Sequence, residues 1–86
     1  MYRVVFHTHF KKKLKKLPQK IREQFYERLN IFVENPWYPL LNNHSVHAIY
    51  PGRRSINVTG DYRALFREFE DEIMFTDIDT HSELYG

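Results

Sequence analysis

Residues 62–78 read YRALFREFEDEIMFTDI, which is two strand-like runs joined by a pair of acidic residues. The run at 62–69 is rich in aromatic and aliphatic side chains and is the best strand candidate in the chain. Glu70 and Asp71 favour a hairpin turn, after which the run at 72–78 returns as a second strand. This hairpin places an antiparallel sheet at the centre of the predicted fold.

The segment before the hairpin contains further strand signals. Residues 46–50 alternate up to the turn pair Pro51-Gly52, and residues 54–59 alternate again up to Gly60-Asp61. These runs add one or two strands, which gives an antiparallel sheet of three to four strands. Residues 36–47 contain two prolines and two adjacent asparagines and are interpreted as a loop.

The N-terminal half predicts a strand followed by two helices. Residues 2–6, YRVVF, suit a short buried strand. A first helix capped by Thr8 should stop near residues 16–17, because the ring of Pro18 clashes with the preceding turn. A second helix then follows Pro18 and ends at residues 35–36. Apolar residues recur at helical spacing in both helices, as Phe10, Leu14 and Leu17 and then as Ile21, Phe25, Leu29 and Phe32 or Val33.

The element order predicts a two-layer α+β fold in a single domain that spans residues 1–86. An N-terminal strand and a helical hairpin pack on the three- to four-stranded antiparallel sheet. Residues 79–86 form a short C-terminal helical turn that Thr80 or Ser82 can cap. The apolar face of the sheet lies against the hairpin. We expect the other face to stay open and polar and to carry the function.

The composition excludes several classes of protein. The chain has no cysteine, so disulfides, thiolate zinc sites and cysteine nucleophiles are ruled out. No run of 18 apolar residues is present, and the N-terminus lacks the pattern of a signal peptide. We therefore expect a soluble cytoplasmic protein that does not bind membranes.

Charge is distributed unevenly along the chain. Residues 1–43 carry nine Lys or Arg and three Asp or Glu, whereas residues 44–86 carry four and eight. This pattern leaves two interpretations open, a surface that binds a polyanion such as nucleic acid and a solvated helix face that keeps a small protein soluble. The basic excess is concentrated in Lys11, Lys12, Lys13, Lys15 and Lys16, followed by Lys20 and Arg22.

Histidine pairs raise the question of a metal site. His7 and His9 form one pair and His44 and His47 another, but no third ligand follows either pair at a recognisable spacing. The chain also has no glycine-rich phosphate loop and no G-x-S-x-G nucleophile motif. We therefore expect neither a metal nor a cofactor.

A different set of residues suits RNA cleavage without metal. This chemistry needs a base for the 2′-hydroxyl, an acid for the leaving 5′-oxygen, cations for the phosphorane and a surface that holds the bases. Histidine serves as acid or base near neutral pH, arginine binds phosphate, and tyrosine stacks on bases. The candidates of these types are His44, Arg53, Arg54, Arg63, His81 and Tyr85.

Two motifs resemble those of a known family. Residues 55–66, SINVTGDYRALF, resemble the S-I-x-I-x-G-D-Y-R-x-x-F/Y stretch of the RelE/ParE toxin superfamily. Residues 79–86, DTHSELYG, are similar to the G-T-H-x-x-L-Y/F ending of its YafQ-like branch, and residues 41–44 to the segment that carries its loop histidine. The opening of the chain, with its phenylalanines, spaced lysines and Leu-Pro, is also typical of this family. The resemblance covers essentially the whole chain.

The resemblance implies a toxin of a type II toxin–antitoxin pair, with a cognate antitoxin as partner and a possible hetero-oligomer. Most such toxins are metal-independent endoribonucleases that cut mRNA on the ribosome and inhibit translation. The family's positions imply that His81 is the general acid, that His44 or Asp61 is the base, that Arg63 with Arg54 holds phosphate, and that Tyr85 orients the substrate. Arg53 and the lysines at 11–13 and 15–16 are then expected to bind RNA.

Asn57 departs from the family pattern. The YafQ-like branch has a histidine at this strand position, and asparagine cannot exchange a proton at neutral pH. The alternatives are that His44, His47 or Asp61 supplies the base, that the enzyme is slower, or that the protein is not a nuclease. In the last case it would be a ParE-like toxin that poisons DNA gyrase, or an inactive relative that only binds its antitoxin.

Overall fold

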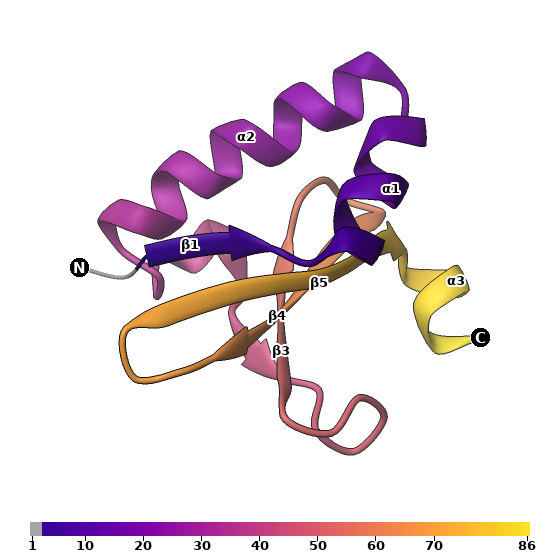
Figure 1. Cartoon of the computed structure of the whole chain (residues 1–86). Coiled ribbons are helices and arrows are strands. Elements are labelled where there is room, and N and C mark those ends of the chain that lie inside the picture. The colour runs from indigo at the N-terminus through magenta and orange to yellow at the C-terminus, as the bar shows by residue number, and fades with distance from the viewer. Residues whose placement is uncertain (1–2) are drawn as a thin grey trace.

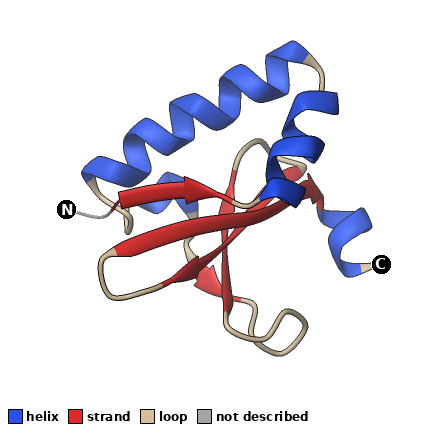
Figure 2. Cartoon of the chain, viewed as in Figure 1, coloured by secondary structure: helices blue, strands red, loops and turns tan. Residues whose placement is uncertain are grey.

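The computed structural model describes residues 3–86 (Figure 1). In chain order the elements are β1 (Arg3–Phe6), α1 (Thr8–Lys16), α2 (Gln19–Glu34), the 3₁₀ helix η1 (Pro39–Leu41), β2 (His44–Ser45), β3 (Arg53–Asn57), β4 (Tyr62–Glu68), β5 (Glu72–Thr80) and α3 (His81–Tyr85). The helices α1 and α2 lie together over one face of the sheet, and α3 lies beyond the end of β5 (Figures 1 and 2). The predicted α+β class is therefore confirmed.

The sheet has five strands in the order β1-β5-β4-β3-β2. The predicted hairpin at 62–78 is confirmed, because β4 and β5 pair antiparallel across it. The predicted strand count is too low, since the N-terminal strand joins the sheet and pairs with β5 in parallel, with Val4 opposite Ile73. A parallel pair needs a long connection, and the whole segment from α1 to β4 supplies it. Tyr2, which was predicted to begin this strand, lies outside the described residues.

A cluster of aromatic rings fills the space between the helical hairpin and the sheet. Phe75 is fully buried, and its ring centroid lies 5.3–6.0 Å from those of five other phenylalanines. These neighbours come from β1, both long helices and β4, namely Phe6, Phe10, Phe25, Phe32 and Phe66. Large rings bury much apolar area per residue, so a short chain without disulfides still builds a substantial core.

The helix boundaries follow the sequence with one correction. Helix α1 ends at Lys16 and α2 begins directly after Pro18, as predicted. The prediction that Thr8 caps α1 is wrong, because Thr8 is already its first helical residue. The cap is His7, whose Nδ1 accepts a hydrogen bond of 3.1 Å from the backbone N–H of His9.

Residues 46–50 form a turn and not the predicted strand. The backbone N–H groups of Ile49 and Tyr50 both donate to the Val46 carbonyl, at 3.0 and 2.8 Å. The alternating pattern was misleading because Val46 and Tyr50 are also four residues apart, which places them on one side of a helical turn. The predicted loop at 36–47 instead contains η1 and β2. The predicted strand at 54–59 begins at Arg53 and ends at Asn57.

The face of the sheet opposite the long helices is only partly open. The turn at 46–52 and helix α3 fold over its centre and bury Val46, Leu65 and Leu84 between them. The Tyr50 hydroxyl donates a hydrogen bond of 2.5 Å to the Leu84 carbonyl, which ties the turn to α3. Within residues 3–86, no helix is long and apolar enough to cross a membrane.

Candidate functional site

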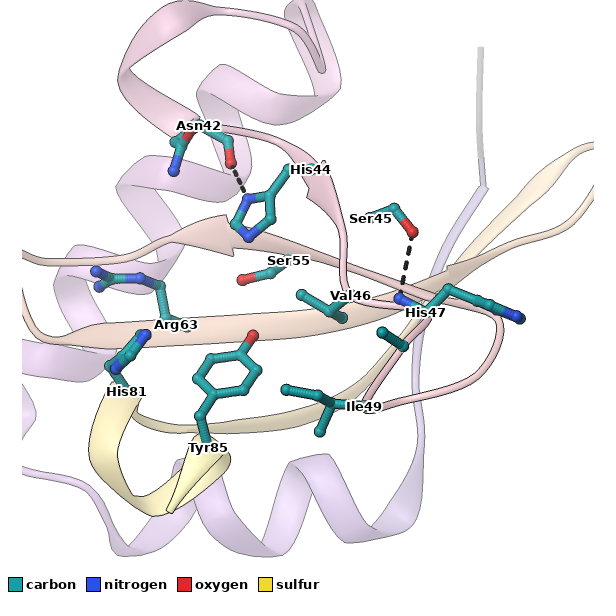
Figure 3. Close-up of a pocket in the computed structure, with 11 residues that line it drawn as sticks. Asn42, His44, Ser45, Val46, His47, Ile49, Ser55, Arg63, His81 and Tyr85 are labelled. Atoms are coloured by element: carbon teal, nitrogen blue, oxygen red, sulfur yellow. Dashed lines mark hydrogen bonds between the residues drawn. The ribbon is translucent and has the colours of Figure 1, made fainter.

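A cavity of about 680 Å³, here called the main cavity, opens on this partly covered face (Figure 3). It lies between the segment at 42–49, the strands β3 and β4, and helix α3. Its lining includes His44, Ser55, Arg63, His81 and Tyr85. The structure therefore brings four of the five predicted catalytic residues to one cavity.

His44 enters the main cavity from the short strand β2. Asn42, just before it, has a left-handed backbone with φ of 47°, a conformation that asparagine tolerates better than most residues. The turn brings the Asn42 carbonyl to 2.7 Å from His44 Nδ1. A carbonyl only accepts, so Nδ1 carries the hydrogen and Nε2 of the neutral ring keeps its lone pair. The nitrogen of the neutral His44 ring that remains free to accept a hydrogen bond is therefore Nε2.

Helix α3 supplies His81 and Tyr85, which are one turn apart and share one side of the helix. Their ring centroids lie 4.7 Å apart. The Thr80 hydroxyl caps the helix by accepting from the Glu83 N–H at 3.2 Å, as predicted. The His81 N–H donates to the Asp61 carbonyl at 2.8 Å, which fixes the start of α3 against the turn before β4. The His81 side chain remains exposed.

Arg63 carries an uncompensated positive charge beside these rings. Its Nη1 donates to the carbonyls of Thr59, Gly60 and Tyr62 at 3.1–3.2 Å, so backbone oxygens hold the side chain in place. Its cross-strand neighbour Asp79 bonds Lys13 instead. Among residues 3–86, no carboxylate lies within salt-bridge distance of Arg63. An anion entering the main cavity would meet a fixed guanidinium.

Two buried hydroxyl groups in the main cavity have no hydrogen-bond partner in the described part of the chain. Ser55 is fully buried with its Oγ unpaired, and the Tyr85 Oη is likewise unpaired. The Tyr85 hydroxyl points toward Ser55 in Figure 3. Buried polar atoms are nearly always bonded, so each of these two needs a partner from outside the chain, either a water molecule or a ligand. Sequence reasoning missed Ser55, although it shares a strand face with Arg53 and Asn57.

Other predicted residues lie outside the main cavity. Asp61 is exposed and is not among the residues that line the main cavity. Its backbone carbonyl accepts the hydrogen bond from the His81 N–H at the start of α3. Arg54 points away, with its Nε donating to Asn43 Oδ1 at 2.8 Å and its guanidinium carbon 4.9 Å from the centre of the Trp37 ring. Arg53 lines a separate pocket.

Four lysines of α1 are exposed, and the fifth, Lys13, is engaged in ion pairs. Lys11 and Lys15 line a groove with Phe6 and Tyr26 between the two long helices, and Lys12 and Lys16 are exposed. Lys13 is engaged within the protein, at 2.7 Å from both Asp77 and Asp79. These ion pairs remove Lys13 from the surface that could bind a polyanion.

The ion pairs of Lys13 shift two pKa values. Partial burial disfavours the charged form of Lys13, but hydrogen bonds to Asp77 and Asp79 outweigh it and raise the pKa of Lys13. Burial likewise disfavours the charged form of Asp79. Hydrogen bonds from Lys13 and from the Thr80 N–H outweigh that burial and lower the pKa of Asp79. Both groups are therefore held in their charged forms at neutral pH.

One histidine of each pair accepts a hydrogen bond from the backbone. His7 caps α1, and His47 Nδ1 accepts from the Gly52 N–H at 2.8 Å. His9 Nε2 lies 3.4 Å from Asp77 Oδ1. Across the described ranges, no three His, Asp or Glu side chains gather closely enough to hold a metal ion.

Comparison with known proteins agrees with the fold and the motifs. The family model described as the ParE toxin of the type II toxin–antitoxin system parDE matches residues 4–85. The crystal structure of YafQ from E. coli strain BL21(DE3) superposes with a TM-score of 0.81 at 16% identity and full coverage of both chains. The E. coli DinJ-YafQ complex gives 0.72 at 20% identity, again with full coverage.

A solved structure from an archaeon has the same fold. The archaeal RelE-RelB complex from Pyrococcus horikoshii OT3 gives a TM-score of 0.71 at 21% identity and covers 92% of this chain and 93% of that one. No curated protein matches the sequence. The expectation of a RelE/ParE-like fold is confirmed by these superpositions.

Proposed function

The chain belongs to the family of ParE toxins of type II toxin–antitoxin systems, and we propose that this toxin is a metal-independent endoribonuclease that cleaves mRNA on the ribosome and so inhibits translation. The observation that supports this activity is the gathering of His44, Arg63, His81 and Tyr85 around one cavity. Two imidazoles, a guanidinium and an aromatic ring are the groups that cleavage of a phosphodiester needs.

The proposed reaction is an intramolecular transesterification, in which a 2′-oxygen of the RNA attacks the adjacent phosphorus. His44 Nε2 takes the proton of a 2′-hydroxyl, and the 2′-oxygen forms a bond to phosphorus. The bond from phosphorus to the 5′-oxygen breaks, and His81 donates a proton to that oxygen. The products are a 2′,3′-cyclic phosphate and a 5′-hydroxyl. The hydrogen bond from His44 Nδ1 to Asn42 leaves Nε2 free for its part in this reaction.

Arg63 and Tyr85 have distinct parts in the proposal. The fixed guanidinium of Arg63 stabilises the negative charge that grows on the phosphorane, an effect worth about 3 kcal/mol for one well-placed donor. Tyr85 stacks on or orients a base next to the scissile bond.

The proposed partner is a cognate antitoxin, which would form a hetero-oligomer with this chain and block its activity. Solved structures with this fold include complexes of the DinJ-YafQ, YoeB-YefM and RelE-RelB pairs. An mRNA target also places the toxin in the cytoplasm. The exposed lysines Lys12 and Lys16 and the groove lysines Lys11 and Lys15 would contact ribosomal or messenger RNA.

Gyrase poisoning is the second candidate function. Two observations favour it, since Asn57 stands where the YafQ-like branch has a histidine and Asp61 lies outside the main cavity. A toxin of this kind acts through protein contacts and needs no base or acid. It would induce a DNA damage response and would leave mRNA intact.

The test is brief expression in cells, followed by mapping of mRNA 5′ ends, with His81→Ala as the matched control. The proposal expects new 5′-hydroxyl ends within codons for the wild type and none for the control. Growth arrest with intact mRNA would reject the nuclease and support gyrase as the target. Normal growth with intact mRNA would identify a relative that has lost its activity.

A further inference from the structure

A second pocket, here called the arginine pocket, lies on the same sheet face as the main cavity. It has a volume of about 280 Å³ and is lined by His7, His9, Arg53, Arg67, Met74 and Thr76. Its lining therefore contains four basic side chains and no carboxylate. The turn at 46–52 borders both hollows, since its first residues line the main cavity and Gly52 lies against the Arg67 guanidinium.

The two arginines face each other across adjacent strands. Arg53 on β3 is the direct cross-strand partner of Arg67 on β4. Like charges placed opposite each other destabilise a sheet unless a counter-charge lies between them. Across residues 3–86, neither arginine has a carboxylate within salt-bridge distance. The protein therefore holds two adjacent positive charges whose compensating anion it does not itself supply.

The contacts of both guanidinium groups are with neutral groups, and hydrogen bonds fix the guanidinium of Arg53. Arg53 Nε donates to Thr76 Oγ1 at 3.2 Å, and its Nη1 donates to the Pro51 carbonyl at 3.3 Å. The Arg67 guanidinium carbon lies 5.5 Å from the centre of the Phe69 ring. A guanidinium fixed by neutral partners loses little side-chain entropy when it binds an anion, so the arginine pocket is prepared for one.

The start of α1 adds to the positive potential. Since His7 Nδ1 accepts from the His9 N–H, Nε2 of the neutral His7 ring carries the hydrogen and can donate. The positive end of the α1 dipole lies beside these two histidines. Asp77, which approaches His9 at 3.4 Å, is already paired with Lys13 at 2.7 Å and is not part of the lining.

We propose that the arginine pocket binds a backbone phosphate of the RNA whose scissile bond lies in the main cavity, an inference that rests on the proposed nuclease function. Arg67 lies four residues beyond Arg63 on β4, which is roughly 13 Å along the strand. Arg53 likewise lies two residues before Ser55 on the same face of β3. The turn at 46–52 and α3 cover Leu65 between the two sites, so an extended single strand of a few nucleotides would pass over this turn to span both. The arginine pocket would then set the path of the RNA beyond the turn.

The test separates binding from cleavage by using a 2′-O-methyl RNA oligonucleotide, which lacks the attacking hydroxyl. Its affinity for the purified toxin is measured by fluorescence anisotropy between 50 and 300 mM salt. Loss of one phosphate contact to a single strand lowers the salt slope by about 0.7, equivalent to about five-fold in affinity at 0.1 M salt. Arg67→Gln should show this loss, and Arg67→Lys, which retains the charge, should keep the slope.

Lys20→Gln is the matched control, because it removes one charge from an exposed position on α2, which covers the opposite face of the sheet. If Arg67→Gln weakens binding no more than Lys20→Gln while the wild type binds and cleaves RNA, the phosphate site is wrong and the nuclease remains. If the wild type neither binds the oligonucleotide nor cleaves RNA, the proposed function fails and the phosphate site fails with it.

Discussion

Asn57 and Arg63 are direct cross-strand partners in the antiparallel pairing of β3 and β4. The Asn57 Oδ1 is buried and has no hydrogen-bond partner in the described chain. The guanidinium of Arg63, on the opposite strand, does not donate to it. Arg63 bonds backbone carbonyls instead and faces the main cavity. A proton-carrying side chain at position 57 would therefore stand beside the proposed phosphate site.

Asn57→His should increase the rate of RNA cleavage by at least about tenfold. A positioned general base or acid contributes about 10²–10⁴-fold, and asparagine cannot act as one. The measurement is the single-turnover cleavage rate of a ribosome-bound message. Asn57→Gln provides the control, since it retains the amide, and equal rates for the two variants would show that position 57 has no part in proton transfer.

Arg63→Ala should lower the cleavage rate by about 10²–10³-fold, because it removes the donor that stabilises the phosphorane. Arg63→Lys should restore only part of the rate, since an ammonium cannot bond two phosphate oxygens through a planar fork. Arg3→Ala is the control, because Arg3 lies on the edge strand β1 and pairs with Glu72 of β5, so its loss should leave cleavage unchanged. Full activity of Arg63→Ala would contradict the assignment.

Tyr50→Phe should destabilise helix α3 and, as a consequence, lower the rate of cleavage. The lost hydrogen bond to the Leu84 carbonyl is worth about 1 kcal/mol and holds the helix that carries His81 and Tyr85. Hydrogen exchange should accelerate in α3 while the amides of β4 and β5 keep their protection. Tyr38→Phe, at an exposed position, is the control. Unchanged exchange in α3 would show that the turn does not hold this helix.

Lys13→Gln should destabilise the protein by about 1 kcal/mol at neutral pH, as expected for a partly exposed ion-pair network. The pKa of Lys13 is raised above its ordinary value of 10.5, so its contribution is lost as pH rises through the folded-state pKa. The pKa of Asp79 is lowered below its ordinary value of 3.8, so its contribution is lost as pH falls through the folded-state pKa. Urea unfolding at several pH values measures this effect.

The difference in unfolding free energy between wild type and Lys13→Gln should thus be constant near neutrality and shrink at both pH extremes. Lys12→Gln is the control, because Lys12 is the neighbour of Lys13 in the sequence and is exposed. If Lys12→Gln and Lys13→Gln were equally stable, the network with Asp77 and Asp79 would contribute nothing measurable.

Local patterns predicted most of the fold, and the misses have a physical cause. The hairpin at 62–78 was predictable because both its strands and its turn show clear local signals. The parallel neighbour of β5 was not, since residues 3–6 say nothing about which strand they pair with. The prediction of a strand at 46–50 was wrong because Val46 and Tyr50 are four residues apart. This spacing fits both the alternation of a strand and one turn of a helix.

The candidate site was predicted in part. The family motifs pointed to His44, Arg63, His81 and Tyr85, and these four line one cavity. The expected phosphate role of Arg54 finds no support in its placement, because Asn43 and Trp37 hold that side chain elsewhere. Contacts of this kind join residues that are distant in sequence, so no local pattern could show them.

The parallel pairing of β1 with β5 also determines when the protein can fold during its synthesis. Phe75 of β5 completes the aromatic cluster around the helices, so a nascent chain that has not yet reached this residue exposes rings that the finished protein buries. Pairing of segments so distant in sequence slows folding. The complete core can therefore form only after β5 has been synthesised, and until then the phenylalanine rings of the helices remain exposed to other chains.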